Sequence, residues 1–141
     1  QPVAKWNLDA LAWLRRQSDV RIAADESMYG PREAMELILK EAVDVFVIKL
    51  IKAEGLFRAR QAIAIAEAAG IQCTLVSPYE TSVGAMANIH LAAAAPNVPF
   101  ACEVGVDLAD DPGSGLQIEG SAAVVPAGPG LGVTLREGIF A

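Results

Sequence analysis

The sequence has few of the features that mark membrane, nucleic-acid-binding and secreted proteins. No apolar run reaches the roughly 18 residues that a transmembrane helix needs, so we expect no membrane span. Eleven basic residues face 17 acidic ones, and the net charge of −6 argues against nucleic acid or an anionic membrane as a partner. The first residues do not follow the basic, apolar and small-residue order of a signal peptide.

Cysteine and histidine are also scarce. The two cysteines, Cys73 and Cys102, have neither zinc-binding nor redox spacing, so we interpret them as reduced thiols in a core. Such cysteines favour a cytoplasmic protein. The single histidine, His90, lies inside a predicted helix, and we interpret it as structural.

Apolar residues are abundant. They make up 53% of the 141 residues, whereas charged residues make up only 20%. The length suits one domain or a piece of a larger protein. This composition is apolar for a chain of this length. It indicates either a large, well-covered core or apolar surfaces that a partner covers.

Two kinds of segment alternate along the first hundred residues. Apolar residues at helical spacing predict helices, and β-branched or aromatic runs predict strands. The predicted helices cover residues 7–18, 31–42, 55–69 and 82–95, and the predicted strands cover residues 20–25, 45–48, 71–76 and 99–104. This alternation favours right-handed βαβ units and a parallel sheet. The strands are apolar throughout, so we expect both faces of the sheet to be covered.

After residue 107 the composition changes. Gly, Pro, Ser and Asp become frequent, and the stretch "LQIEGSAAVVPAGPGLGV" predicts extended pieces joined by turns. We therefore divide the chain into residues 1–107, which are built from alternating strands and helices, and residues 108–141, a C-terminal segment. We interpret Asp110 and Asp111 as a solvated loop in that segment.

Charged residues fall at or near the ends of the predicted strands. Asp25 ends the first strand, Lys49 ends the second, Glu80 follows the third and Glu103 lies in the fourth. The carboxyl ends of parallel strands form the active face of α/β sheets and barrels. Asp25 and Lys49 are one strand–helix unit apart, so we expect them to project from adjacent strands onto the same face.

Two interpretations of this pair stay open. Carboxylates at strand ends can hold Mg²⁺, and a lysine beside them can serve as a general base for a proton next to a substrate carboxylate. A cation would stabilise the resulting enediolate. Alternatively, Asp25 and Lys49 form a salt bridge that ties two strands together.

Several ordered motifs resemble the enolase superfamily, and most of all its muconate-lactonizing subgroup. They are the opening "QPV", then "AADES", then "IKLIKAEG" 24 residues later, then "SPYETSVGAMANIHLAAA" and "VPAGPGLGV". Enzymes of this superfamily use Lys or His bases with Mg²⁺ and an enediolate. One departure lies in the second lysine motif, where Glu54-Gly55 stands in place of the usual Gly-Gly.

The resemblance implies roles for five residues at or near the ends of the first three predicted strands. Asp25 matches the last of three acidic ligands of Mg²⁺ or Mn²⁺, and Glu26 is its neighbour in a supporting position. Lys49 matches the catalytic acid/base, and Lys52 matches a supporting lysine. Glu80 matches a catalytic-site glutamate near the end of the barrel's seventh strand.

The last predicted strand also carries an implied role. Residues 102–107 fall where the family's final strand contacts substrate, so Glu103 and Asp107 are the candidate substrate-binding residues. Asp107 could meet an amino group on the substrate.

The resemblance implies a fold as well. Residues 1–107 would be the second half of a (β/α) barrel of TIM type, and residues 108–141 would pack toward the barrel or toward a lid domain. The N-terminal lid domain, the first half of the barrel and two metal ligands would lie upstream, so we expect this chain to need that missing half or a partner chain. We expect the complete protein to be a homo-oligomer.

The implied function is an isomerase or lyase that acts on a small carboxylate substrate. The reaction starts with proton removal alpha to a carboxylate, or with the reverse addition. Muconate cycloisomerase is the first hypothesis, and an amino-acid or dipeptide racemase, epimerase or dehydratase is the second. Two hypotheses from other classes are a non-catalytic half-barrel fragment that docks on a partner and a doubly wound domain that binds a small ligand.

Overall fold

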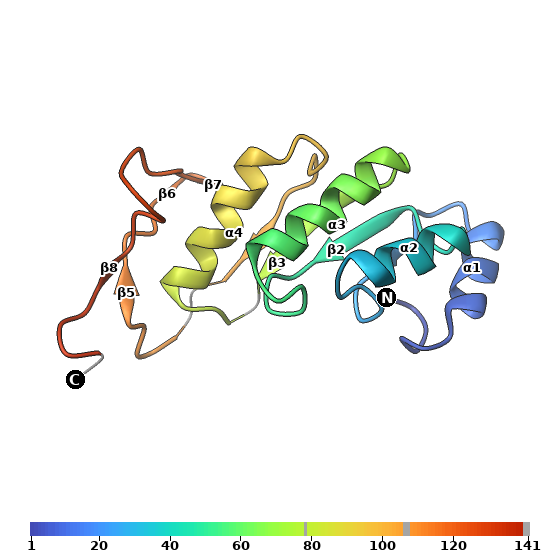
Figure 1. Cartoon of the computed structure of the whole chain (residues 1–141), viewed down its shortest axis with the longest axis horizontal. Helices are drawn as coiled ribbons and strands as arrows, with labels where there is room; N and C mark the ends of the chain where they lie inside the picture. Colours follow the sequence, from blue (N-terminus) through green and yellow to red (C-terminus); the bar gives the residue numbers. More distant parts are fainter. Residues whose placement is uncertain (78, 106–107, 140–141) are drawn as a thin grey trace.

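The computed structural model describes residues 1–77, 79–105 and 108–139. Within them, strands and helices alternate as the sequence predicted (Figure 1). The helices are α1 (Leu8–Gln17), α2 (Pro31–Leu39), α3 (Leu56–Ala68) and α4 (Ser82–Ala94). The strands of the main sheet are β1 (Ala23–Ala24), β2 (Val45–Ile48), β3 (Gln72–Ser77) and β4 (Glu103–Val104).

The four strands form one parallel sheet in the order β1-β2-β3-β4, which is also their order along the chain. Ala24 pairs with Phe46, and Phe46 pairs with Cys73. Consecutive parallel strands joined by helices are the repeating unit of a (β/α) barrel. The predicted parallel α/β sheet is therefore confirmed, although β1 and β4 are shorter than the strands expected from residues 20–25 and 99–104.

Local signals in the sequence explain where the helices begin and end. The side chain of Asn7 accepts a hydrogen bond from the Ala10 N–H and caps α1, and Pro31 occupies the first turn of α2. Gly70 follows α3 with φ of 72°, a conformation that glycine adopts without strain. The side chain of Thr81 accepts a hydrogen bond from the Gly84 N–H and caps α4, directly before the predicted start at residue 82.

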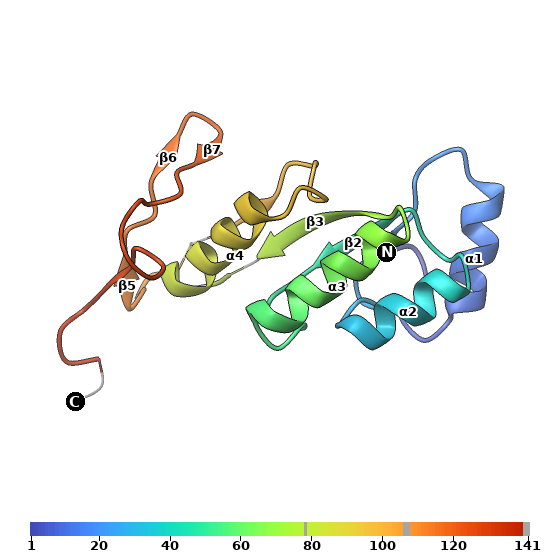
Figure 2. The same cartoon turned by 45° about the horizontal axis from the view of Figure 1, so that its top comes forward.

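Helices cover one face of the sheet. α2, α3 and α4 lie side by side along it (Figures 1 and 2). The core forms between them and the strands, and Leu37, Phe46 and Leu75 are fully buried there. Burying large apolar side chains of this kind contributes about 1.5–3 kcal/mol each.

The opposite face of the sheet is less covered. Along β3, Cys73, Leu75 and Ser77 are buried, whereas the residues between them are only partly buried. Alternate side chains of a strand point to opposite faces, so the second face of β3 is open in the described part of the chain. The apolar composition of the strands predicted cover on both faces, which these residues lack. An uncovered inner face is, however, what we expect of half a barrel.

The C-terminal segment contains two small antiparallel pairs, as the turn-rich composition predicted. β5 (Gly113–Ser114) pairs with β8 (Thr134–Leu135), and β6 (Ile118–Glu119) pairs with β7 (Ala122–Ala123). They lie at the end of the molecule opposite α1 (Figure 1).

Asp111 joins this segment to the start of α4. Its carboxylate accepts a hydrogen bond from the Ser82 N–H at 2.9 Å, and it also bonds the Ser82 hydroxyl and the Gly113 N–H. Asp111 thus satisfies the Ser82 N–H in the first turn of α4. It lies in a loop, as we expected, but it is half-buried and has a structural role that the interpretation as a solvated loop did not include. Asp110 pairs with Arg136 at the surface.

No helix in residues 1–77, 79–105 and 108–139 is long and apolar enough to cross a membrane.

Candidate functional site

The candidate site lies at the carboxyl ends of β1 and β2. Asp25 directly follows β1, and Lys49 directly follows β2. The two strands are neighbours in the sheet, so both side chains leave it at the same edge. Lys52 joins them because the chain turns back immediately after Lys49, with hydrogen bonds from the N–H groups of Lys52 and Ala53 to the Lys49 carbonyl.

Two lysines bind the carboxylate of Asp25. Lys49 Nζ lies 2.8 Å from Oδ1 and 3.0 Å from Oδ2, and Lys52 Nζ lies 2.8 Å from Oδ1. All three side chains are only 16–23% exposed, so solvent screens these contacts less than it screens a surface pair. The structure thus brings Asp25 and Lys49 together, as the sequence predicted, and adds Lys52.

The charges in this group set the protonation of Asp25. Burial alone would raise the pKa of its carboxyl group, but hydrogen bonds and charge attraction from Lys49 and Lys52 outweigh burial and hold the pKa below its usual value. Asp25 is therefore ionised at neutral pH, which is the form that a metal ligand or an ion-pair partner requires.

Glu26 and Tyr29 lie on the outer side of the site. Glu26 is exposed and lines a hollow of about 280 Å³ together with Tyr29 and Lys5. The Tyr29 ring centre lies 5.7 Å from Lys52 Nζ and 5.4 Å from Lys5 Nζ, within the range of cation–π attraction. The sequence motifs did not single out Tyr29.

Glu80 lies near the end of β3, but α4 holds its carboxylate. Asn88 Nδ2 lies 3.4 Å from Glu80 Oε1. A Cβ atom placed on Gly84 would lie 1.8 Å from Glu80 Oε2, so the carboxylate occupies space that only a glycine leaves open. The contacts of the Glu80 side chain are thus with the first turns of α4. A catalytic role for Glu80 requires that its carboxylate reach the substrate from this position.

Of the two candidate substrate-binding residues, the structure describes one. Glu103 begins β4, pairs in register with Val76 and is exposed. Asp107 lies outside the described residues, together with residue 106. These two residues adjoin the boundary that we predicted between the barrel half and the C-terminal segment.

The described residues do not by themselves fit a Mg²⁺ ion. No group of three or more His, Cys, Asp and Glu side chains in residues 1–77, 79–105 and 108–139 could hold one. Asp25 brings one carboxylate to the strand-end site, and lysines contact both of its oxygens. Mg²⁺ demands octahedral oxygen coordination, so any metal site must draw most of its ligands from elsewhere.

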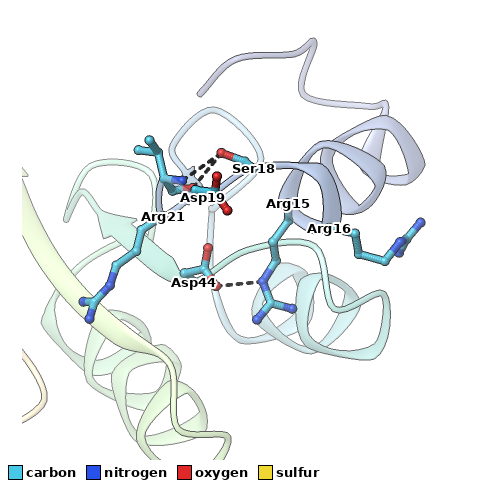
Figure 3. A pocket seen from close by; sticks show the side chains of 7 residues that line it. Arg15, Arg16, Ser18, Asp19, Arg21 and Asp44 are labelled. Atoms are coloured by element: carbon cyan, nitrogen blue, oxygen red, sulfur yellow. Dashed lines mark hydrogen bonds and ion pairs between the residues drawn. The ribbon is translucent and has the colours of Figure 1, made fainter.

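A second cavity, of about 370 Å³, lies at the opposite end of the sheet (Figure 3). Its residues precede β1 and β2 rather than follow them. Arg15 Nε is bound to Asp44 at 2.7 Å, and Figure 3 shows Arg16 and Arg21 pointing away from that pair in different directions. The arginines do not converge on one point, so this cavity offers no site comparable to the strand-end group.

The parallel strands follow one another in chain order, and helices cover one face of the sheet. A partly buried acid meets two lysines at the strand ends. Together these features define part of a (β/α)-barrel protein. Residues 1–139 match the protein family described as "Enolase C-terminal domain-like". The chain belongs to this family, within the enolase superfamily, and it forms part of the barrel.

Two kinds of isomerase occur among the relatives that the chain matches. The chain is 36% identical to muconate cycloisomerase 1 of Rhodococcus opacus over 142 residues, which cover 96% of this chain and 37% of that protein. The crystal structure of 2-chloromuconate cycloisomerase from Rhodococcus opacus 1CP matches it with a TM-score of 0.91 and 38% identity, over 97% of this chain and 38% of that one.

The second kind is an epimerase. A dipeptide epimerase from Enterococcus faecalis V583, solved as a complex with Mg and the dipeptide L-Leu-L-Tyr, matches with a TM-score of 0.85 and 33% identity. The match covers 95% of this chain and 39% of that one. The chain therefore spans less than two fifths of the length of each of these relatives.

Proposed function

We propose that this chain carries the acid/base half of an enolase-superfamily active site, which transfers a proton at the carbon next to a substrate carboxylate. The observation that carries the proposal is the contact of Lys49 and Lys52 with Asp25 at the carboxyl ends of neighbouring strands. Membership of the enolase family supports it. Small carboxylates, such as the muconates and dipeptides named for the relatives, are the proposed substrates.

Lys49 is the better candidate for the proton-transferring group. It follows β2 directly, and within the described residues its side-chain ammonium group hydrogen-bonds only the Asp25 carboxylate. Lys52 instead also donates to the backbone carbonyl of Asp25, which ties it to the loop. A catalytic lysine must exchange its partner for the substrate, whereas a supporting lysine keeps its contacts. We therefore assign acid/base chemistry to Lys49 and support to Lys52.

In the proposed reaction, Lys49 Nζ accepts the proton from the alpha carbon and can return it. As a base, neutral Lys49 forms an N–H bond while the alpha C–H bond breaks and its electron pair moves toward the carboxylate as an enediolate. As an acid, Lys49 returns a proton to the alpha carbon. In the reverse addition that forms a lactone, the same lysine protonates the carbon that the ring closure leaves carrying negative charge.

Asp25 is proposed as one ligand of a divalent cation, Mg²⁺ or Mn²⁺. Two solved relatives are named as complexes with Mg. The cation, when bound, would stabilise negative charge on the substrate carboxylate. Because the described residues bring only one carboxylate to this site, the other ligands would come from elsewhere in the protein. Glu26, next to Asp25, would support the ligand rather than replace it.

Cycloisomerisation is the first hypothesis for the overall reaction, because the first relative and the first structural match are both cycloisomerases. Epimerisation of a dipeptide is the alternative, since epimerases match at similar identity. Glu80, Glu103 and Asp107 are proposed to contact the substrate, and a residue that binds a dipeptide amino group would favour the epimerase. We further propose that residues 108–141 pack toward the barrel or toward a lid domain, and that the complete protein is a cytoplasmic homo-oligomer.

The test uses the protein at its native length with Mg²⁺ or Mn²⁺ present. Muconate and chloromuconate are followed by ultraviolet absorbance, and L,L-dipeptides are followed in D₂O by proton NMR. Conversion of a muconate supports the cycloisomerase, and inversion with deuterium at the alpha carbon supports the epimerase. If no carboxylate reacts or exchanges, the non-catalytic hypothesis gains and the proposed function fails.

A further inference from the structure

The side chain of Gln1 uses its whole hydrogen-bonding capacity next to the candidate site. Its Oε1 accepts from the N–H groups of Asp25 at 3.1 Å and Ser27 at 3.0 Å. Its Nε2 donates to the Val3 carbonyl and to the Ser27 hydroxyl, both at 2.9 Å. A neutral amide has two acceptor positions and two donor hydrogens, so none of them is unused.

These bonds act on the backbone that carries Asp25. Gln1 fixes the N–H of Asp25, and Lys52 donates to its carbonyl. The backbone of Asp25 is therefore held on both sides of the Cα atom from which the carboxylate projects. The Ser27 hydroxyl extends the network by donating to the Lys5 carbonyl at 2.8 Å.

We propose that Gln1 is a positioning residue for the proton transfer at Lys49. It fixes the backbone of Asp25 and thereby sets where the carboxylate meets the Lys49 ammonium group. This inference rests on the proposed function, because it concerns the geometry of that reaction. Misplacing a reacting group by about 1 Å can lower a rate by roughly 10²-fold.

If Gln1 has a purely structural role, its replacement should affect stability but not turnover. The same bonds tie residues 1–5 to the loop after β1, and their loss would then lower thermal stability alone. Turnover by the folded enzyme would stay as it was, because the lysines would still find Asp25 in place. The comparison of kcat, KM and melting temperature separates the two roles.

The decisive variant is Gln1→Met in the protein at its native length. Methionine has a similar length but cannot accept from the Asp25 N–H. We expect kcat for alpha-proton exchange to fall roughly 10- to 100-fold, with KM little changed. Hydrogen exchange should also accelerate at the amides of Asp25 and Ser27 relative to the amides of β2.

Two further variants serve as controls. Ser27→Ala removes one bond of the Gln1 amide but leaves Oε1 on the Asp25 N–H, so its loss of kcat should be much smaller. Asn97 Nδ2 donates to the Ile71 carbonyl at 2.7 Å, beside the opposite end of β3. Asn97→Leu therefore removes a comparable amide clamp far from Asp25, and it should lower the melting temperature without lowering kcat.

Each outcome decides between the two claims. An active wild type with an equally active Gln1→Met variant overturns the positioning role and leaves the proposed function standing. A Gln1→Met variant with a lower melting temperature but unchanged kcat, as expected for Asn97→Leu, also overturns the positioning role. A wild type that exchanges no carboxylate tested removes the proposed function, and this inference with it.

Discussion

Lys49 and Asp25 are 24 positions apart in the sequence, yet Lys49 Nζ contacts both oxygens of the Asp25 carboxylate, at 2.8 and 3.0 Å. The contact exists because β1 and β2 are parallel neighbours that end at the same edge of the sheet. A salt bridge between two strands and an acid/base site share this geometry. Removing the lysine distinguishes the two roles. Loss of a salt bridge lowers stability, whereas loss of an acid/base group lowers turnover.

Asp44 gives a prediction on acid stability. Burial alone would raise the pKa of Asp44, but its bonds with the Ile22 N–H at 2.8 Å and with Arg15 outweigh burial and lower it from 3.8. The pKa of such a carboxyl group is lower in the folded than in the unfolded state. The group therefore stabilises the fold fully at pH values above its unfolded-state pKa, and this stabilisation is lost as the pH falls through the folded-state pKa. We expect Asp44→Asn to lower the free energy of unfolding by about 1–3 kcal/mol at pH 7, and by less at pH 3.

Denaturant titrations at the two pH values measure this difference. Asp9→Asn is the matched control, because Asp9 pairs with Lys40 at the surface and its side chain is 84% exposed. Its effect should stay within about 0.5 kcal/mol. An Asp44→Asn variant with the same loss at pH 3 as at pH 7 would contradict the account.

The two cysteines should react at different rates with a thiol reagent. Cys73 is fully buried, and burial raises its pKa to about 12, so its thiol stays protonated at pH 8. Cys102 is only half-buried. We expect N-ethylmaleimide to label Cys102 in the folded protein and to label Cys73 only after denaturation, as peptide mass spectrometry can show. Equal labelling of both in the native state would place Cys73 outside the core.

Gly84→Ala tests the position of Glu80. Alanine is favoured over glycine in a helix by about 1 kcal/mol, so the fold should not be weakened. The new Cβ would, however, take the space of the Glu80 carboxylate. If Glu80 acts from this position, kcat should fall in Gly84→Ala and also in Glu80→Gln.

Gly128→Ala is the control for this substitution, because a Cβ at Gly128 meets nothing within 4 Å and its φ is not positive. Its kcat should equal that of the wild type. Unchanged kcat in Gly84→Ala would show that Glu80 is not needed where the structure places it.

Much of the fold follows from local patterns in the sequence. The predicted strand 45–48 coincides with β2 because its residues are β-branched or aromatic, which favours a buried strand. The meeting of Asp25 with Lys49 also followed from spacing alone, since one strand–helix unit separates two strand ends. Periodicity and the geometry of parallel sheets were sufficient for both.

The contacts that spacing did not predict depend on where the chain returns after long connections. Asp111 bonds the Ser82 N–H at the start of α4 only because the C-terminal segment folds back onto that helix. Gln1 reaches Asp25 in the same way, although the motif "QPV" at the start of the chain was a signal that this residue matters. The turn of Glu80 onto Gly84 is a choice among side-chain conformations, which spacing does not determine.

The role of Lys49 is tested by alpha-proton exchange in D₂O with the wild type, Lys49→Met and Lys52→Met, each at its native length and with Mg²⁺ or Mn²⁺. We predict that Lys49→Met keeps its fold and loses roughly 10²- to 10⁴-fold in exchange rate, with a smaller loss for Lys52→Met. A Lys49→Met variant that exchanges as fast as the wild type, and differs from it only in stability, would make the contact with Asp25 a structural salt bridge and contradict the central claim.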